Sequence, residues 1–96
     1  MKYLVIGEYD PDDMDAQFKK AEEYAEVKRK NPNKFPKTSY PVHFMLNEPA
    51  IMAVWDTDDE ETIANKIAFM LPEVVYTVIP LVDAKLFMKT YIEIKK

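Results

Sequence analysis

Three segments of this 96-residue chain have the β-branched and aromatic composition of strands, yet they are apolar at almost every position instead of at alternate positions. They are Lys2–Tyr9, Ala50–Trp55 and Val74–Val82. Because successive side chains of a strand point to opposite faces of a sheet, such segments present apolar groups on both faces. A sheet built from them needs a cover on each side. This requirement limits the folds open to the chain more than any other feature of its sequence.

The first helix has clear start and stop signals. Asp10 is a candidate N-cap, Pro11 suits the first helical position, and Asn31-Pro32 ends the helix after about 20 residues. An apolar stripe at helical spacing predicts its buried face, namely Met14, Phe18, Ala21 and Ala25.

A second helix is predicted between Asp58 and Leu71. Thr57 and Glu60 have the spacing of a capping box, and Pro72 follows the last helical turn. The expected apolar face consists of Ile63, Ile67, Met70 and Leu71.

The segment between the two helices is predicted as a loop and a hairpin. Asn31–Pro41 contains three prolines and has no periodicity, which predicts a loop. Val42–Leu46 is predicted as a short strand that pairs with Ala50–Trp55 through the turn Asn47–Pro49.

The C-terminal third contains the last strand and one further element. Pro80 has no N–H, so its strand is expected at an edge of the sheet or at a bulge. Asp83 can cap a final helix that carries Phe87, Tyr91 and Ile94 on one face. The alternation in Thr90–Ile94 also fits a strand, and the helix is the favoured alternative.

The resulting order, β-α-β-β-α-β followed by a C-terminal helix, is typical of the ferredoxin-like α+β fold. This fold has a four-stranded antiparallel sheet and two helices on one face, here in a single domain over residues 1–96. The second face would expose on the order of several hundred Å² of apolar surface, more than a monomer usually tolerates. The sequence therefore predicts a homodimer in which two copies pack sheet against sheet.

Composition excludes several classes of function. Thirteen Lys and Arg against seventeen Asp and Glu give a net charge of −4, which argues against nucleic-acid binding. The absence of cysteine excludes disulfides and thiolate nucleophiles, and a single histidine argues against a transition-metal site. We expect no cofactor. With no recognisable signal peptide and no apolar stretch near the roughly 20 residues of a membrane helix, a cytoplasmic protein is expected.

With this layout the chain resembles the dimeric α/β-barrel superfamily, in which two ferredoxin-like subunits pack their sheets together. The resemblance covers nearly the whole chain and is carried by the KYLVIGEY strand, the acidic DTDDEET segment and the closing EVVYTVIPLVDAKLF segment. It is strongest to small stand-alone members whose function is not established. The superfamily also includes antibiotic-biosynthesis-type monooxygenases, haem-degrading enzymes and lactone isomerases. The haem-degrading pattern is absent, because the first strand has Glu8 in place of an Asn and the second helix has no His.

The resemblance implies that a small ligand binds in a cleft between the helices and the sheet. Four aromatic residues are candidates for lining such an apolar site: Tyr9, Phe44, Trp55 and Tyr76. Packing in the core or at the dimer interface is the commoner fate of such residues.

Two residues are candidates for proton transfer in an alternative function, that of a cofactor-independent isomerase or monooxygenase on the same scaffold. His43 is the only side chain whose ordinary pKa lies near neutrality, and Glu8 has apolar neighbours on its strand. For both residues an ordinary structural role is the commoner outcome. A third alternative is a structural or regulatory module whose second sheet face docks on a different protein.

Overall fold

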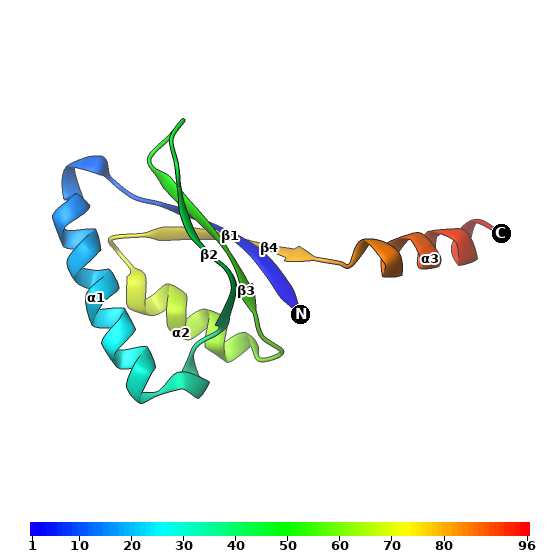
Figure 1. The fold of residues 1–96 in the computed structure, drawn as a ribbon, viewed down its shortest axis with the longest axis horizontal. Coiled ribbons are helices and arrows are strands. Elements are labelled where there is room, and N and C mark those ends of the chain that lie inside the picture. The colour runs from blue at the N-terminus through cyan, green and yellow to red at the C-terminus, as the bar shows by residue number, and fades with distance from the viewer.

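The computed structural model describes all residues 1–96 and contains one sheet and three α-helices (Figure 1). In chain order the elements are β1 (Lys2–Glu8), α1 (Met14–Lys30), β2 (Lys37–Met45), β3 (Ala50–Asp56), α2 (Glu60–Met70), β4 (Val75–Leu81) and α3 (Ala84–Lys95). Short 3-10 turns, η1 (Pro11–Asp13) and η2 (Pro32–Lys34), flank α1. The strands pair antiparallel in the order β2-β3-β1-β4. The predicted α+β class and the element order are confirmed.

The register of the sheet assigns each side chain to one of two faces. Val5 of β1 pairs with Ala53 of β3 and with Val78 of β4. These residues pack with Trp55 and with Ile63 of α2, so their face is covered by helices, and we call it the helix face. By alternation along the strands, their neighbours form the opposite face, which we call the open face.

No part of the single chain covers the open face. Its apolar side chains are Leu4, Ile6, Tyr40, Met52, Val54, Val75, Ile79 and Leu81. Val75 is 56% exposed, Ile79 39% and Tyr40 46%, although the residues facing the other way on β3 are buried. The expectation of a sheet that is apolar on both faces is thus met, and one of the two faces is bare.

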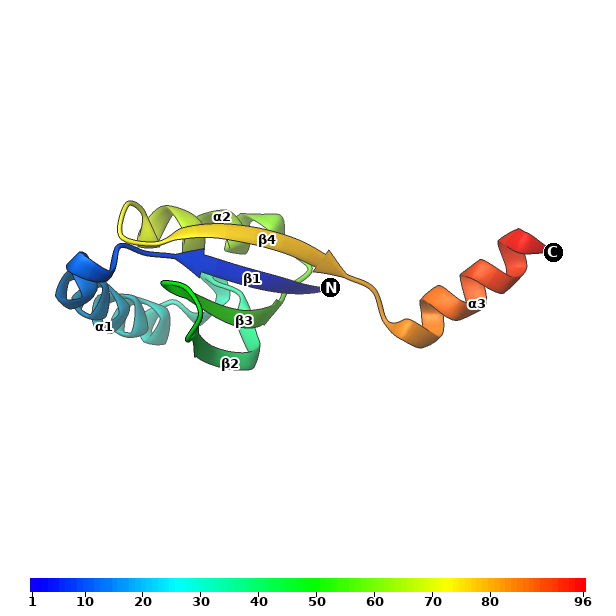
Figure 2. The ribbon, with the colours of Figure 1, turned by 90° about the horizontal axis from the view of Figure 1, so that it is seen from above.

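The C-terminal element is a helix, as favoured, and it extends away from the rest of the chain (Figures 1 and 2). Asp83 caps it by accepting hydrogen bonds from the backbone N–H groups of Lys85 and Leu86, at 2.9 and 3.2 Å. None of its residues is buried. Six apolar side chains are each more than half exposed, namely Leu86, Phe87, Met88, Tyr91, Ile92 and Ile94.

The boundaries of two elements differ from the prediction. β2 begins at Lys37 and not at Val42, so the end of the predicted loop 31–41 belongs to the sheet. Pro41 is tolerated because β2 is an edge strand whose register is irregular between Tyr40 and His43. The edge position predicted from Pro80 is confirmed for β4, which pairs with β1 alone.

The N-cap of α2 also differs from the prediction. The cap is Asp59 and not Thr57, since the Asp59 carboxylate accepts the N–H of Glu61 at 2.9 Å. The Thr57 hydroxyl instead accepts the N–H of Asp59 and pairs with the Thr62 hydroxyl. Two residues able to cap, only two positions apart, made the exact start ambiguous in the sequence.

The predicted buried stripe of α1 is wrong. Phe18 is 49% exposed, and Ala21 and Ala25 also face solvent. The buried residues of α1 are Gln17 and Tyr24. The face of α1 that carries Tyr24 is buried instead, because the Tyr24 ring packs edge-on against Phe35 and Phe69. The ring centroids are 5.0 and 5.6 Å apart. Burying one aromatic ring removes more apolar area from water than burying two alanines.

Candidate functional site

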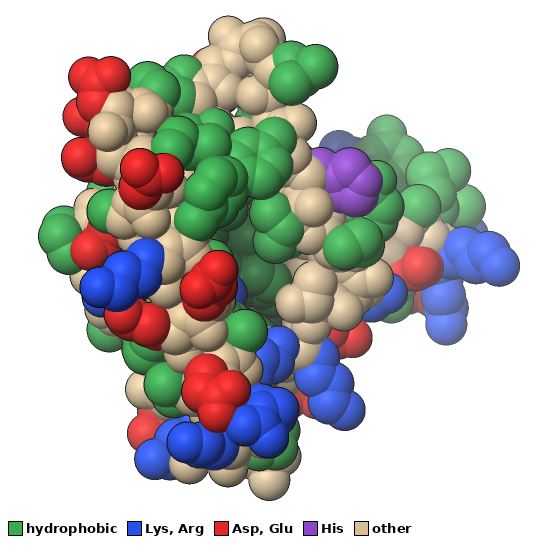
Figure 3. All heavy atoms as spheres, turned by 60° about the vertical axis from the view of Figure 1, so that its left-hand side comes forward, with side chains coloured by type: hydrophobic (Ala, Val, Ile, Leu, Met, Phe, Trp, Pro, Cys, Tyr) green, Lys and Arg blue, Asp and Glu red, His purple; other side chains and the backbone are tan.

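A narrow cleft lies between the helix face of the sheet and α2. Val5 and Ala53 form its floor, and the rings of Trp55 and Tyr76 meet edge-to-face at 5.1 Å in its wall. Its free volume is about 20 Å³, which is room for about one water molecule. The other lining residues are Thr38, Val42, Ile51 and Lys66, and Met52 also borders the cleft although the register places its side chain on the open face. On the side of α1 and β2 the surface is hollowed, with hydrophobic side chains at the bottom of the hollow and acidic and basic side chains along its edge (Figure 3).

Lys66 is the only charged residue that lines the cleft. Its Nζ atom lies 3.3 Å from the centroid of the Tyr24 ring and 5.7 Å from that of Trp55. Burial, followed by the charge of Lys28, lowers the pKa of Lys66 to about 7. The ion pairs of the protein involve the N-terminus, Lys20, Arg29 and Lys30, so the Lys66 ammonium group has no carboxylate partner.

The remaining titratable groups near Lys66 are neutral or cationic near pH 7. Burial raises the pKa of Tyr76 to about 12. Burial and then the neighbouring Tyr76 raise the pKa of Tyr24 well above its ordinary value. Lys28, whose Nζ donates to the Pro36 carbonyl at 3.0 Å, has its pKa lowered by burial. The cleft therefore combines aromatic walls with positive charge and has no negative side chain.

The four predicted ligand-lining residues separate into two pairs. Trp55 and Tyr76 meet in the cleft. Tyr9 and Phe44 meet elsewhere, with ring centroids 6.0 Å apart, and Phe18 packs against Phe44 at 6.3 Å. This second pair does not line the free volume of the cleft.

His43 and Glu8 lie outside the cleft, and the structure does not bring them together. His43 is exposed on the open face, where its ring stacks on Tyr40 at 4.9 Å. Its Nδ1 atom is 2.8 Å from the Pro41 carbonyl oxygen. Glu8 is exposed at the end of β1. A reaction in the cleft would therefore use neither side chain, and their catalytic roles stay predictions.

Sequence reasoning missed Lys66 and Tyr24. The signal for Lys66 was present, because it falls between Ile63 and Ile67 on the face of α2 that packs on the sheet. A lysine on the apolar face of a helix is unusual enough to be singled out. Tyr24 was hidden by the incorrect stripe assigned to α1.

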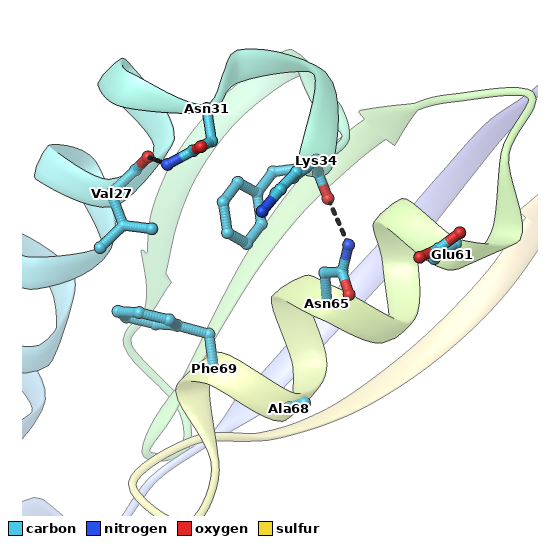
Figure 4. A pocket seen from close by; sticks show the side chains of 8 residues that line it. Val27, Asn31, Lys34, Glu61, Asn65, Ala68 and Phe69 are labelled. Atoms are coloured by element: carbon cyan, nitrogen blue, oxygen red, sulfur yellow. Dashed lines mark hydrogen bonds between the residues drawn. The ribbon is translucent and has the colours of Figure 1, made fainter.

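A second depression, of about 530 Å³, lies on the outer surface between α1, η2 and α2 (Figure 4). The side-chain amides of Asn31 and Asn65 in this depression donate hydrogen bonds to backbone carbonyl groups. Asn65 Nδ2 donates to the Lys34 carbonyl at 2.8 Å, and Asn31 Nδ2 donates to the Val27 carbonyl at 3.1 Å. The Phe69 ring in its wall packs against Tyr24, and the depression shares no lining residue with the cleft.

No family model, curated protein sequence or solved structure matches the chain. What the structure shows is a small α+β fold with a four-stranded antiparallel sheet. No helix in it has both the length and the apolar character needed to cross a membrane. Its function is therefore argued from its surfaces and its cleft.

Proposed function

We propose that the chain is one subunit of a homodimer that binds a small ligand in the helix–sheet cleft of each subunit. The observation that carries the dimer is the open face, an apolar sheet surface with no cover. Packing two such faces together would bury them as the two halves of a dimeric α/β barrel. A two-fold arrangement needs only one self-complementary surface, which a sheet of this kind supplies.

The helix α3 supports the same proposal. Its six exposed apolar side chains have no partner in their own chain, and a well-capped helix with such a face is stable only when the face is buried. We propose that α3 packs on the partner subunit. A stable interface buries about 800 Å² per subunit, and we propose that α3 and the open face contribute to it together.

The ligand-binding part of the proposal rests on Trp55 and Tyr76. Both rings border free space, and both are held by strands of the sheet, β3 and β4, which are rigid supports. The small free volume means that only one end of a ligand enters the cleft. The rest of the ligand would lie in the hollow beside α1 and β2 (Figure 3).

Native mass spectrometry of the untagged protein tests the dimer. We expect the mass of two chains for the unchanged protein and of one chain for Met52→Lys, which places a charge in the middle of the open face. Ala64→Lys, on the exposed surface of α2, is the matched control and should remain a dimer. A single-chain mass for the unchanged protein would contradict the proposal and favour docking of the open face on a different protein.

The fluorescence of Trp55 tests ligand binding, because Trp55 is the only tryptophan and lies in the cleft. We expect small aromatic compounds at millimolar concentration to change its emission in a saturable way. A panel of such compounds without any saturable change would contradict a ligand site in the cleft, and it would leave the dimer unaffected.

A further inference from the structure

Lys66 is placed differently from an ordinary surface lysine. A lysine on a helix usually extends its ammonium group into water and buries only its methylene chain. The Lys66 side chain instead brings its ammonium group over the Tyr24 ring, at 3.3 Å, and close to Trp55. The cation–π contact compensates part of the lost hydration but supplies no counter-charge.

The surroundings of Lys66 lack a negative charge on every side. α1 contributes Tyr24 and the cationic Lys28, β3 contributes Trp55, and β4 contributes Tyr76. Both tyrosines are neutral at physiological pH, because burial raises the pKa of each. A partly buried cation with a second cation nearby is an unfavourable arrangement, and an anion in the cleft would relieve it.

The free space next to Lys66 admits one water-sized polar atom. About 20 Å³ is free in the cleft that Lys66, Trp55 and Tyr76 line together. This volume admits one oxygen of a carboxylate beside two aromatic rings, whereas the hydrophobic bottom of the hollow outside it suits an uncharged body (Figure 3).

We infer that the ligand of this cleft is a small organic monoanion with a carboxylate head and a flat apolar body, and that the Lys66 ammonium group binds the head. This inference rests on the proposed ligand site and adds the class of ligand. Lys66 is neutral in about half of the free protein at pH 7, so binding of the anion takes up a proton. The affinity should therefore fall as the pH rises.

Two probes of nearly equal shape test the charge. Benzoate is anionic above pH 6, and benzamide is neutral. Titrations followed by Trp55 fluorescence at constant ionic strength should give at least tenfold tighter binding for benzoate at pH 6. For benzoate, the affinity should fall about tenfold between pH 6 and pH 8 and about a hundredfold between pH 6 and pH 9, with no such change for benzamide.

Three variants assign the effect to Lys66. Lys66→Met should bind benzoate and benzamide equally and without pH dependence. Lys66→Arg should keep the preference for benzoate but lose the pH dependence up to pH 9, because a guanidinium group stays charged. Lys34→Met removes an exposed lysine of the outer depression and should behave as the unchanged protein. Circular dichroism confirms that each variant is folded.

The outcomes separate this inference from the proposed function. Equal binding of both probes by the unchanged protein would overturn the inference and leave a ligand site in place. A preference for benzoate that persists in Lys66→Met would also overturn it, because another group would then hold the anion. Absence of binding by either probe at 50 mM, about the weakest affinity expected for fragments of this size, would overturn the inference. Failure of the wider aromatic panel as well would remove the ligand site itself.

Discussion

At the scale of single residues, position 7 requires glycine because there is no space for a side chain, and not because of its backbone conformation. A Cβ atom at this position would lie 2.7 Å from Val74 Cγ1 and 2.8 Å from Tyr76 Cε1. Its φ angle is not in the left-handed region, so strain of the backbone plays no part. The only glycine of the chain thus permits Tyr76 to lie against β1 and to complete the wall of the cleft.

Gly7→Ala should therefore overpack the sheet. We expect the free energy of unfolding to fall by about 1–3 kcal/mol, because Val74 is fully buried and has no room to move. Chemical denaturation followed by circular dichroism measures the change. Ser39→Thr adds a methyl group at an exposed position of β2 and should change the stability by less than about 0.5 kcal/mol. Equal stability of Gly7→Ala and the unchanged protein would show that Tyr76 adapts freely.

Lys66 also gives the stability of the folded chain a pH dependence of known sign. Its pKa is about 7 in the folded chain and about 10.4 when unfolded, so the unfolded chain binds more protons between these values. Stability therefore rises with pH over this range. We expect a gain of about 1–2 kcal/mol between pH 7 and pH 9 that is absent in Lys66→Met. The N-terminal amine, whose raised pKa acts in the opposite direction, is common to both proteins and cancels in the comparison. A parallel pH profile for the two proteins would contradict the burial of this lysine.

At the scale of elements, local chemistry was enough to predict the ends of several elements. Asp83 caps α3 as expected, whereas Asp10 caps the 3-10 turn η1 that leads into α1, and α1 itself begins later than predicted, at Met14. The start of β2 could not be predicted in this way, because residues 37–41 are ordered by pairing with β3, a tertiary contact. The rotation of α1 depends in the same way on Phe35 and Phe69, which are distant in sequence.

The same distinction explains what could be predicted of the site. Trp55 and Tyr76 were identified because large aromatic residues within strand-like segments are visible in the sequence. Their meeting with Lys66 and Tyr24 required the packing of α1 and α2 on the sheet. A site assembled from four elements has no local signature.

Deletion of α3 should abolish dimerisation without affecting the folding of the sheet, α1 and α2. Because α3 contributes no buried residue, deletion of residues 84–96 should leave the far-UV circular dichroism of the sheet and of α1 and α2 intact. The two-chain mass should disappear at concentrations where the full chain is dimeric, because the apolar contacts of α3 with the partner are lost. A truncated chain that dimerises as tightly as the full chain would show that α3 has another role.

At the scale of the whole molecule, the single chain is more extended than its length requires. Its radius of gyration is 15.7 Å over the Cα atoms, with extents of 54 × 34 × 18 Å. A compact chain of this length has a radius of about 12–13 Å. The excess comes from α3, which extends the long axis (Figure 2).

Solution scattering can show where α3 lies in the dimer. Two chains that form one compact body should have a radius of gyration of about 16 Å together with the mass of two chains. This value is close to that of the single extended chain, so the mass must be measured on the same sample. A clearly larger radius at the two-chain mass would mean that α3 remains free of the partner.

If the proposed homodimer forms, the bare open face makes the stability of the protein depend on its concentration. In such a dimer each chain covers the open face of the other, so association stabilises the folded state by mass action. The melting temperature then rises with protein concentration. A tenfold dilution then costs about 1.4 kcal/mol per dimer. A newly made chain that meets no second copy keeps an apolar sheet exposed to proteases and to other unfolded chains. At low concentration the chains would thus be degraded or would aggregate, whereas at high concentration dimerisation would protect them.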